Sequence, residues 1–361
     1  MKYKKLLAIS LSLLFSGLIS AQSESEVRTF MKTVRVGKET SLQVLNKYGT
    51  IHITPWNKDS ASIRAEVRAF ATNQAKLGKM FSGISININE AGSVVRAETG
   101  FTENIGMLFE NFKGMTSKII NYDSRVEINY YISIPEYLNL RIDNKYGDVY
   151  MENCSGTLSV TVTNGTFKAN SIGSRSTLTF AFCDAKINSI ASGKIDASFS
   201  EINIGETGDL TITSISSKYE IKKADVISTE SRRDKFFIHD VESLKGNSYF
   251  TDYNLNSLKK DIDLTARYGS ITADLIEKGF ETVVINSGYS DLSLGFDPAA
   301  SYKFDIRHIN SYLVLPEKDT KSERKDINED KKEYMTFGTT GKNPGTSSVR
   351  IDANRGNIYL K

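Results

Sequence analysis

The acidic residues are the first candidates for chemistry in this sequence, because two carboxyl groups about 5–9 Å apart catalyse glycoside hydrolysis. The candidates are Asp143, Asp148, Asp261, Asp263 and Asp291, which lie on strand-like segments or beside turns. Alternating carboxylates on the solvent face of a strand also keep a sheet soluble and protect its edges. No glycine-aspartate nonapeptide repeat surrounds Asp261 and Asp263, so calcium binding is not indicated. We therefore predict no catalytic pair among these residues.

Histidine and cysteine are scarce and scattered. His52, His239 and His308 have no second ligand at metal-binding spacing, and no nucleophile motif accompanies them. Cys154 and Cys183 are the only cysteines, and we expect both to be buried free thiols because the repeat described below places them too far apart for a disulfide. The sequence predicts no catalytic residue, no metal site and no cofactor.

Tyrosine is abundant, with 17 residues, and several stand at or beside turns. Tyr146, Tyr268 and Tyr289 are the clearest examples. Rings that recur at one corner of a repeat can stack on each other, and amphipathic rings also bind proteins and glycans at low entropic cost. We predict packing as their first role and name these three residues as a candidate aromatic binding corner.

The N-terminus indicates export. Lys2, Lys4 and Lys5 precede an apolar stretch, residues 6–19, and small residues follow at Ser20 and Ala21, which is the pattern of a signal peptide. The whole chain of 361 residues has a net charge of +3, and removing residues 1–21 leaves as many basic as acidic residues. A neutral chain lacks the basic surplus that nucleic-acid binding requires. No later apolar run has transmembrane length.

The rest of the chain reads as strands. It has only 5 Pro, and none lies between Pro135 and Pro298, which suits uninterrupted sheet pairing. Apolar and polar residues alternate, and the apparent strand centres Leu140, Val160 and Phe180 recur at a period of about 20 residues. A repeat of this kind with two short strands is typical of a solenoid. The segment 228–250 has no clear register.

Gly and Asn mark the turns of this repeat, as in residues 144–147 and 163–165, and we expect Gly147 to adopt a positive φ there. An antiparallel hairpin array is the alternative, but it need not keep a constant period. We therefore predict an all-β fold, a single-chain parallel β-helix or solenoid. Parallel crossovers are almost always right-handed, which predicts a right-handed coil.

The predicted domains are a signal peptide (1–21), an N-terminal β-rich capping region (22–135) and the β-helix repeats (136–361). The cap is expected to contain two short helices, at residues 72–81 and 102–117, from their helical spacing of apolar residues. A cap is needed because the end of a solenoid exposes unpaired backbone groups. Residues 317–346 are rich in charge, glycine and polar residues, and we predict a solvated charged loop inserted into the repeats.

Several of these segments together resemble the putative-adhesin β-strand-repeat family of exported bacterial envelope proteins. The matching segments are residues 46–51, 134–140, 144–149, 349–351 and 356–358. The resemblance covers nearly the whole mature chain and rests on architectural turns and strands. It implies an exported β-solenoid, and it supplies no catalytic residues.

We therefore expect a non-enzymatic, adhesin-like binding or structural protein of the periplasm or cell surface of a Gram-negative bacterium. Its partner is expected to be a protein or a glycan, and no nucleic acid. One alternative is a polysaccharide lyase or glycoside hydrolase built on the β-helix. A second alternative is an envelope sensing or regulatory protein that acts through a partner protein.

Overall fold

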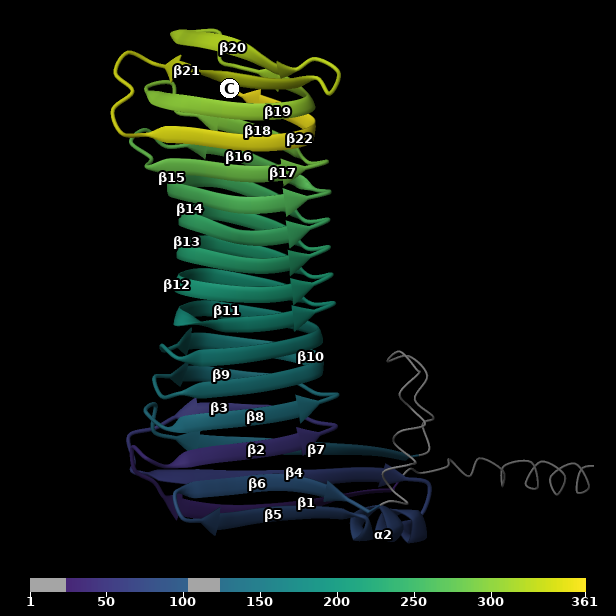
Figure 1. The fold of residues 1–361 in the computed structure, drawn as a ribbon. Coiled ribbons are helices and arrows are strands. Elements are labelled where there is room, and N and C mark those ends of the chain that lie inside the picture. The colour runs from purple at the N-terminus through teal and green to yellow at the C-terminus, as the bar shows by residue number, and fades with distance from the viewer. Residues whose placement is uncertain (1–23, 103–123) are drawn as a thin grey trace, which may run out of the picture.

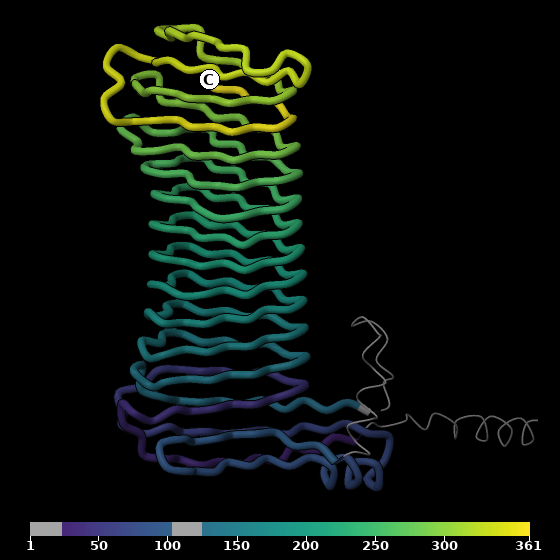
Figure 2. Tube along the Cα trace, in the orientation of Figure 1, coloured from purple at the N-terminus to yellow at the C-terminus, as the bar shows by residue number. Residues whose placement is uncertain are grey.

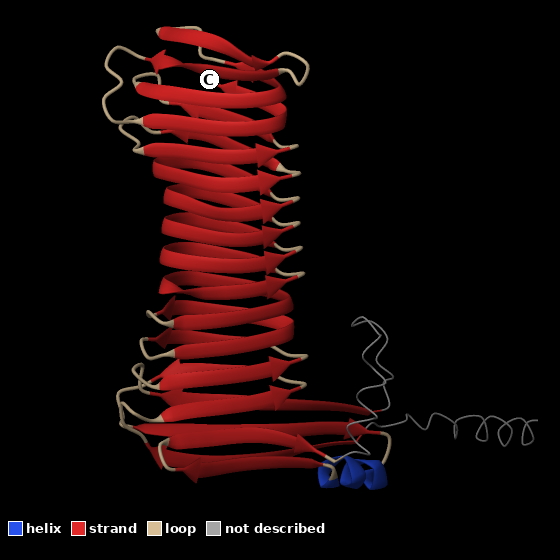
Figure 3. Ribbon diagram, in the orientation of Figure 1, coloured by secondary structure: helices blue, strands red, loops and turns tan. Residues whose placement is uncertain are grey.

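The computed structural model describes residues 24–102 and 124–361, and strands dominate both ranges (Figure 1, Figure 3). These residues form 22 strands and one α-helix, α2 (Gln74–Ser82). Within them, no helix is both long and apolar enough to cross a membrane. The predicted signal peptide and the second predicted helix lie outside the described residues.

Strands in the first part of the chain are β1 (Glu24–Arg35), β2 (Ser41–Lys47), β3 (Ile51–Pro55), β4 (Ser60–Ala71), β5 (Ile84–Ala91), β6 (Val94–Phe101) and β7 (Ser124–Ile134). The middle strands are β8 (Asn139–Lys145), β9 (Val149–Cys154), β10 (Leu158–Ile172), β11 (Ser176–Ser198), β12 (Glu201–Ile215), β13 (Lys218–Arg232), β14 (Lys235–Tyr249) and β15 (Asp252–Arg267). The last strands are β16 (Ser270–Ile276), β17 (Thr282–Gly288), β18 (Asp291–Phe296), β19 (Tyr302–Val314), β20 (Thr320–Asn328), β21 (Glu333–Thr340) and β22 (Ser348–Leu360).

The middle strands form a two-walled parallel solenoid. In β10, residues 158–163 belong to one wall, here called wall A, and residues 165–172 belong to the opposite wall, wall B. Each wall pairs in parallel with the same wall of the next turn, and one such turn is here called a rung. The successive rungs stack into a long rod (Figure 1, Figure 2). The predicted all-β solenoid with parallel strands is therefore confirmed.

The spacing between rungs is shorter than the prediction. Leu158 pairs with Leu140 on one side and with Ser176 on the other, and stacked side chains of this region lie 18 positions apart in the sequence. From β11 to β14 stacked residues lie 17 positions apart, so that Glu201 pairs with Lys218. The predicted, longer spacing is wrong, because Val160 stacks on Ile142 and Leu178. Alternate residues share one face of a strand, so a two-residue shift leaves the apolar pattern unchanged and hides the true register.

The segment without a clear register in the sequence, residues 228–250, continues the rungs in the structure, with one register shift against β15 between Val241 and Ser243. It lies in β13 and β14, which pair residue by residue from Lys218 with Lys235 to Arg232 with Tyr249. Inside this part of the rod, the buried rings of Tyr219, Phe236 and Tyr253 stack with centroids 4.7 and 5.0 Å apart. Large aromatic side chains in an interior column fill the space between the walls and bury extensive apolar area.

At the N-terminal end the pairing becomes antiparallel. The strands β2 and β3 still form a parallel rung beneath β8 and β9, inside the range predicted as a cap. Beyond them, wall A ends with the antiparallel hairpin β5–β6, and wall B ends with β7, β4 and β1. The helix α2 packs beside β1, β4 and β5, and its N-cap Asn73 accepts a hydrogen bond from the backbone N–H of Lys76. The helix matches the first of the two predicted helices.

The C-terminal end contains the main departure from the expected topology. The last strand, β22, lies between β17–β18 on one side and β19 on the other, so the rod does not end with the end of the chain (Figure 1). The predicted charged loop, residues 317–346, is wrong, because β20 and β21 form an antiparallel hairpin there on β19. The outermost strand, β20, carries the run of charges from Glu323 to Asp326, and charged side chains on an edge strand discourage pairing with other sheets.

The turn prediction at Gly147 also needs correction. The residue with positive φ is Tyr146, with φ 56°, and Gly147 does not have a positive φ. Gly147 is required for a different reason: a Cβ atom there would overlap the carbonyl group of Gly49 in the neighbouring rung. The same close approach recurs one rung on, where a Cβ at Gly165 would overlap the carbonyl oxygen of Gly147.

We predict that Gly147→Ala lowers the free energy of unfolding by about 1–3 kcal/mol, because the added methyl group overpacks the contact with Gly49. Thermal or urea unfolding followed by circular dichroism measures the change. Gly37→Ala is the matched control, because a Cβ at Gly37 meets no atom within 4 Å. Equal stability of the two variants would contradict the close approach.

Candidate functional site

One corner of the rod joins wall A to wall B through a single residue with positive φ. We call it the left-handed corner, and its residues have φ between 46° and 65°: Tyr48, Tyr146, Asn164, Phe182, Phe199, Ser216, Arg233, Phe250, Tyr268, Tyr289, Asn310 and Arg355. The ladder of backbone hydrogen bonds continues through this bend. The N–H of Phe199, for example, donates to the carbonyl of Ile215, and that of Tyr268 donates to the carbonyl of Gly288. A one-residue corner therefore keeps the register between rungs.

All three predicted residues, Tyr146, Tyr268 and Tyr289, occupy this corner. Tyr268 and Tyr289 stack with ring centroids 5.1 Å apart, and Phe250 stacks on Tyr268 at 4.9 Å. Tyr146 lies in a separate group nearer the N-terminus, stacked on Tyr48 at 5.5 Å. The structure thus brings two of the three together, and their binding role stays a prediction.

Two further corner rings are missed by the sequence prediction, although their signal is present. Phe182 and Phe199 stack with their planes 4° apart and centroids 5.1 Å apart, and more than half of each side chain is exposed, 56% and 55%. The signal is an aromatic residue directly before Cys183 or Ser200, equivalent to the tyrosine–glycine pairs elsewhere. The wrong repeat length places these residues out of line with Tyr146.

The corner rings are not explained by backbone preference. An L-residue in the left-handed region costs about 1–2 kcal/mol, a cost that Gly avoids and Asn tolerates well. One stacked aromatic pair contributes about 0.5–1.5 kcal/mol. Two stacked rings occupy two such positions but form one pair, so stacking offsets only part of the backbone cost. Exposed rings in strained positions are a common feature of functional surfaces.

Behind the middle part of this corner runs a ladder of polar side chains, formed by the residues that directly follow the corner residues 199, 216, 233 and 250. The hydroxyl of Ser200 accepts from the N–H of Cys183 at 3.1 Å, and the hydroxyl of Ser217 accepts from the N–H of Ser200 at 3.2 Å. Asp234 Oδ1 then accepts from the N–H of Ser217 at 2.7 Å, and Thr251 Oγ1 accepts from the N–H of Asp234 at 3.3 Å. These bonds satisfy backbone donors at the bend and hold the corner in one geometry.

Asp234 is the one carboxylate in this ladder. Its side chain is almost fully buried, and Oδ2 accepts from the hydroxyl of Ser231 at 2.6 Å and from the N–H of Arg232 at 3.1 Å. Burial raises the pKa of Asp234 above its usual value, and these hydrogen bonds oppose the rise.

The row of rings is interrupted at Ser216 and Arg233. A hollow of about 930 Å³ extends along the corner here, from Asn164 past Phe182 and Phe199 to Arg233. Lys218 and Lys235 line it beside Arg233, and Lys218 Nζ contacts Glu201 and Glu220 at 3.2 and 2.7 Å. The corner therefore offers aromatic faces next to a gap lined by charged side chains of both signs.

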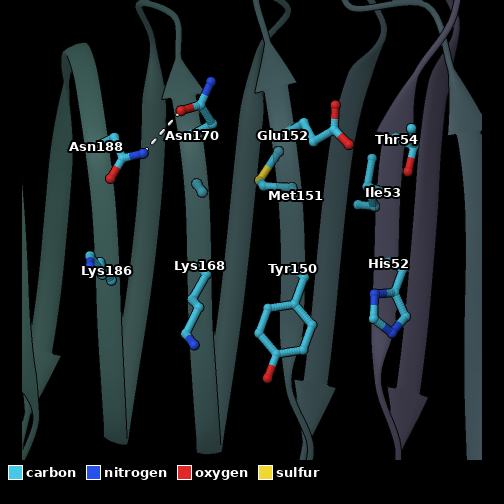
Figure 4. A pocket seen from close by; sticks show the side chains of 11 residues that line it. His52, Ile53, Thr54, Tyr150, Met151, Glu152, Lys168, Asn170, Lys186 and Asn188 are labelled. Atoms are coloured by element: carbon cyan, nitrogen blue, oxygen red, sulfur yellow. Dashed lines mark hydrogen bonds between the residues drawn. The ribbon is translucent and has the colours of Figure 1, made fainter.

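Wall B carries a second hollow, of about 420 Å³ (Figure 4). His52, Tyr150, Lys168 and Lys186 stand in one row across neighbouring strands, and Figure 4 shows their side chains side by side. The His52 ring stacks on Tyr131 with centroids 5.2 Å apart and lies tilted against Tyr150 at 5.4 Å. Lys168 Nζ lies 5.6 Å from the centre of the Tyr150 ring. The histidine is therefore held by aromatic contacts.

Amide side chains form a second row in the same hollow. Asn188 Nδ2 donates to Asn170 Oδ1 at 3.0 Å, so the amides link one rung to the next (Figure 4). A neighbouring hollow of about 560 Å³ shares Lys186 and Asn188 and continues along wall B to Phe237 and His239. The result is a shallow polar strip along the rod.

The carboxylates considered for glycoside hydrolysis do not form a pair. Asp143 lies in β8 of wall A and Asp148 precedes β9 of wall B, so they face away from each other. Asp261, in wall A, accepts hydrogen bonds from Ser243 and Thr282, several rungs from Asp143. Asp291 accepts from the backbone and side chain of Asn357. Asp261 and Asp291 are thus used to link neighbouring rungs.

The remaining polar candidates also lie apart. His239 contacts Asp240 at 3.0 Å on the surface, and His308 is buried against Thr336, where burial lowers the pKa of its imidazole. Cys154 and Cys183 are buried free thiols, and burial raises the pKa of Cys154 to about 11. Within the described ranges, no three His, Cys, Asp or Glu residues gather in a metal-binding arrangement.

Comparisons with known proteins add little to this geometry. No family model matches the chain, and no curated protein matches it. Among solved structures, a putative cell adhesion protein from Clostridium sporogenes is similar over 93% of this chain and 99% of its own, with 12% sequence identity. Its TM-score is 0.18, which is too low to support a conclusion about fold or function. The class of protein is therefore set by the structure itself, a two-walled parallel β-solenoid with an aromatic corner.

We predict that Asp234→Asn removes a contribution that raises the free energy of unfolding as the pH falls. Relative to the wild type, the variant should therefore lose stability on acidification. The pKa of Asp234 is raised on folding, so between its ordinary value of 3.8 and the raised value the folded protein binds more protons than the unfolded chain. The contribution of Asp234 to stability therefore rises as the pH falls through this window and is lost as the pH increases. Urea unfolding of both proteins at several pH values from 7 to 4 measures this difference.

The control for this measurement is Asp225→Asn, which removes an exposed carboxylate from β13 of the adjacent rung. This control shows how far the loss of one negative charge by itself changes the pH dependence of stability. Parallel stability curves for the wild type and Asp234→Asn would show that Asp234 does not titrate differently on folding.

Proposed function

We propose that this chain is an exported, non-enzymatic binding or structural protein of the cell envelope. The proposed location is the periplasm or the cell surface of a Gram-negative bacterium. The rod would present its left-handed corner to a protein or glycan partner. The observation that carries this proposal is the row of exposed aromatic rings at positions where the backbone favours Gly or Asn.

Three features support the proposal. The rings are rigid and amphipathic, so they lose little conformational entropy when a partner packs on them. They are repeated along a straight edge, which suits an extended partner with several contacts. The acidic residues that an enzymatic alternative would use are on opposite walls and several rungs apart. The sequence resemblance to adhesin-like envelope proteins points in the same direction.

The test uses the chain without residues 1–21 and two probes, lipopolysaccharide and detergent-solubilised outer-membrane proteins from the producing cells. The variant replaces Phe250, Tyr268 and Tyr289 by Asn, which accepts the left-handed conformation. We predict that the triple variant keeps its cooperative thermal unfolding but binds at least about tenfold more weakly, because each lost ring contact is worth about 1 kcal/mol.

Tyr312→Asn is the matched control, because Tyr312 is 63% exposed but lies outside the corner, on β19. Calorimetry or surface plasmon resonance gives the affinities. Unchanged binding by the triple variant would contradict the proposal that the corner rings form the binding surface. Fractionation of producing cells tests the location separately, and recovery of the protein in the cytoplasm would contradict export.

A further inference from the structure

The two ends of the rod are protected to different degrees. At the C-terminal end, the outermost strand β20 is covered with exposed charges, among them Lys321, Glu323 and Lys325. At the N-terminal end, β1 pairs with β4 through all its residues, from Glu24 with Ala71 to Arg35 with Ser60. The described residues provide no strand on the other edge of β1. A free antiparallel edge is a template for another strand.

The outward face of β1 is apolar in its centre. Met31 is 66% exposed and Val27 is 47% exposed, and Thr29 lies between them on the same face. The residues of the other face are already engaged with the cap: Arg28 lies over the Phe81 ring of α2, and Lys32 contacts Glu90 of β5 at 2.9 Å. The exposed apolar pair is therefore a feature of the edge that the fold itself does not use.

The charges of β1 are segregated along the strand. Glu24 and Glu26 lie in its first half, and Arg28, Lys32 and Arg35 follow. A strand of this kind is complementary to itself only when the second copy runs in the opposite direction. A parallel copy would place like charges opposite each other, which is destabilising.

We propose that β1 of one molecule pairs antiparallel with β1 of a second copy, around a twofold axis at Thr29. In this register Val27 lies opposite Met31 of the second copy, and Glu26 lies opposite Lys32 of the second copy. Both copies contribute the same contacts, as a twofold interface requires. Wall B then continues from one rod into the next, and the two β20 ends point outward. This inference is independent of the proposed partner of the corner.

The first test measures the oligomeric state of the chain without residues 1–21 by sedimentation velocity over a range of concentrations. We expect a dimer for the wild type. Val27→Lys combined with Met31→Lys should raise the dimer dissociation constant at least about tenfold, because it places added charge in the apolar centre of the pairing. Circular dichroism and thermal unfolding verify that the variant is folded.

Ile327→Lys is the matched control, because Ile327 is 48% exposed on β20 at the opposite end of the rod. It should leave the dimer unchanged. A wild-type monomer at all concentrations would overturn the proposal and would be the result expected if another segment of the same chain covers this edge. A dimer equally sensitive to Ile327→Lys would overturn it as well.

The second test measures the register. Residues directly opposite in an antiparallel pair have Cα atoms about 4.5–5.5 Å apart, within the range of a disulfide. Thr29→Cys should therefore form a disulfide-linked dimer on mild oxidation, and the native cysteines do not interfere because both are buried. Thr33→Cys, exposed on the same face, lies opposite Ser25 of the second copy and should not cross-link. Equal cross-linking of both variants would contradict the register.

Discussion

The backbone hydrogen-bond ladder between rungs is the constraint on which the rest of the structure depends. Because the pairing is parallel and residue by residue, each position stacks on the equivalent position of the next rung. Side chains of one kind therefore gather into columns: the interior rings of Tyr219, Phe236 and Tyr253, the polar ladder at Ser217 and Asp234, and the exposed corner rings. Such columns form wherever similar residues recur at the spacing of the rungs.

The left-handed corner shows how this constraint connects to function. A single residue with positive φ turns the chain and still donates its N–H to the next rung, so the ladder passes through the bend without a break. The backbone at this corner requires only a residue that tolerates the left-handed region, as Asn164 does. At Phe182, Phe199 and Tyr268, however, the chain places exposed rings, whose stacking offsets only part of the backbone cost. These rings are the residues that the proposed surface contact would use.

The sequence is sufficient to predict the all-β solenoid, the buried free thiols and the corner position of Tyr146, Tyr268 and Tyr289. It is not sufficient for the register, because apolar alternation is equally satisfied when Val160 is placed on Leu140 or on Ile142. The backbone conformation at this corner is also mis-assigned, since the turn pattern gives to Gly147 the positive φ that belongs to Tyr146. The hairpin of β20 and β21 is hidden because edge strands are charged like loops.

The deletion of one rung tests the register most directly. Residues 201–217 run from one left-handed corner to the next, so their removal joins Ser200 to Lys218 and leaves every remaining column aligned. The account predicts that this variant keeps its β-sheet circular dichroism and cooperative thermal unfolding. Deletion of residues 201–220, the length suggested by the apparent sequence repeat, should abolish cooperative unfolding because it inverts the faces of the following strands. Loss of folding after the first deletion, or equal stability after both, would contradict the register of the solenoid.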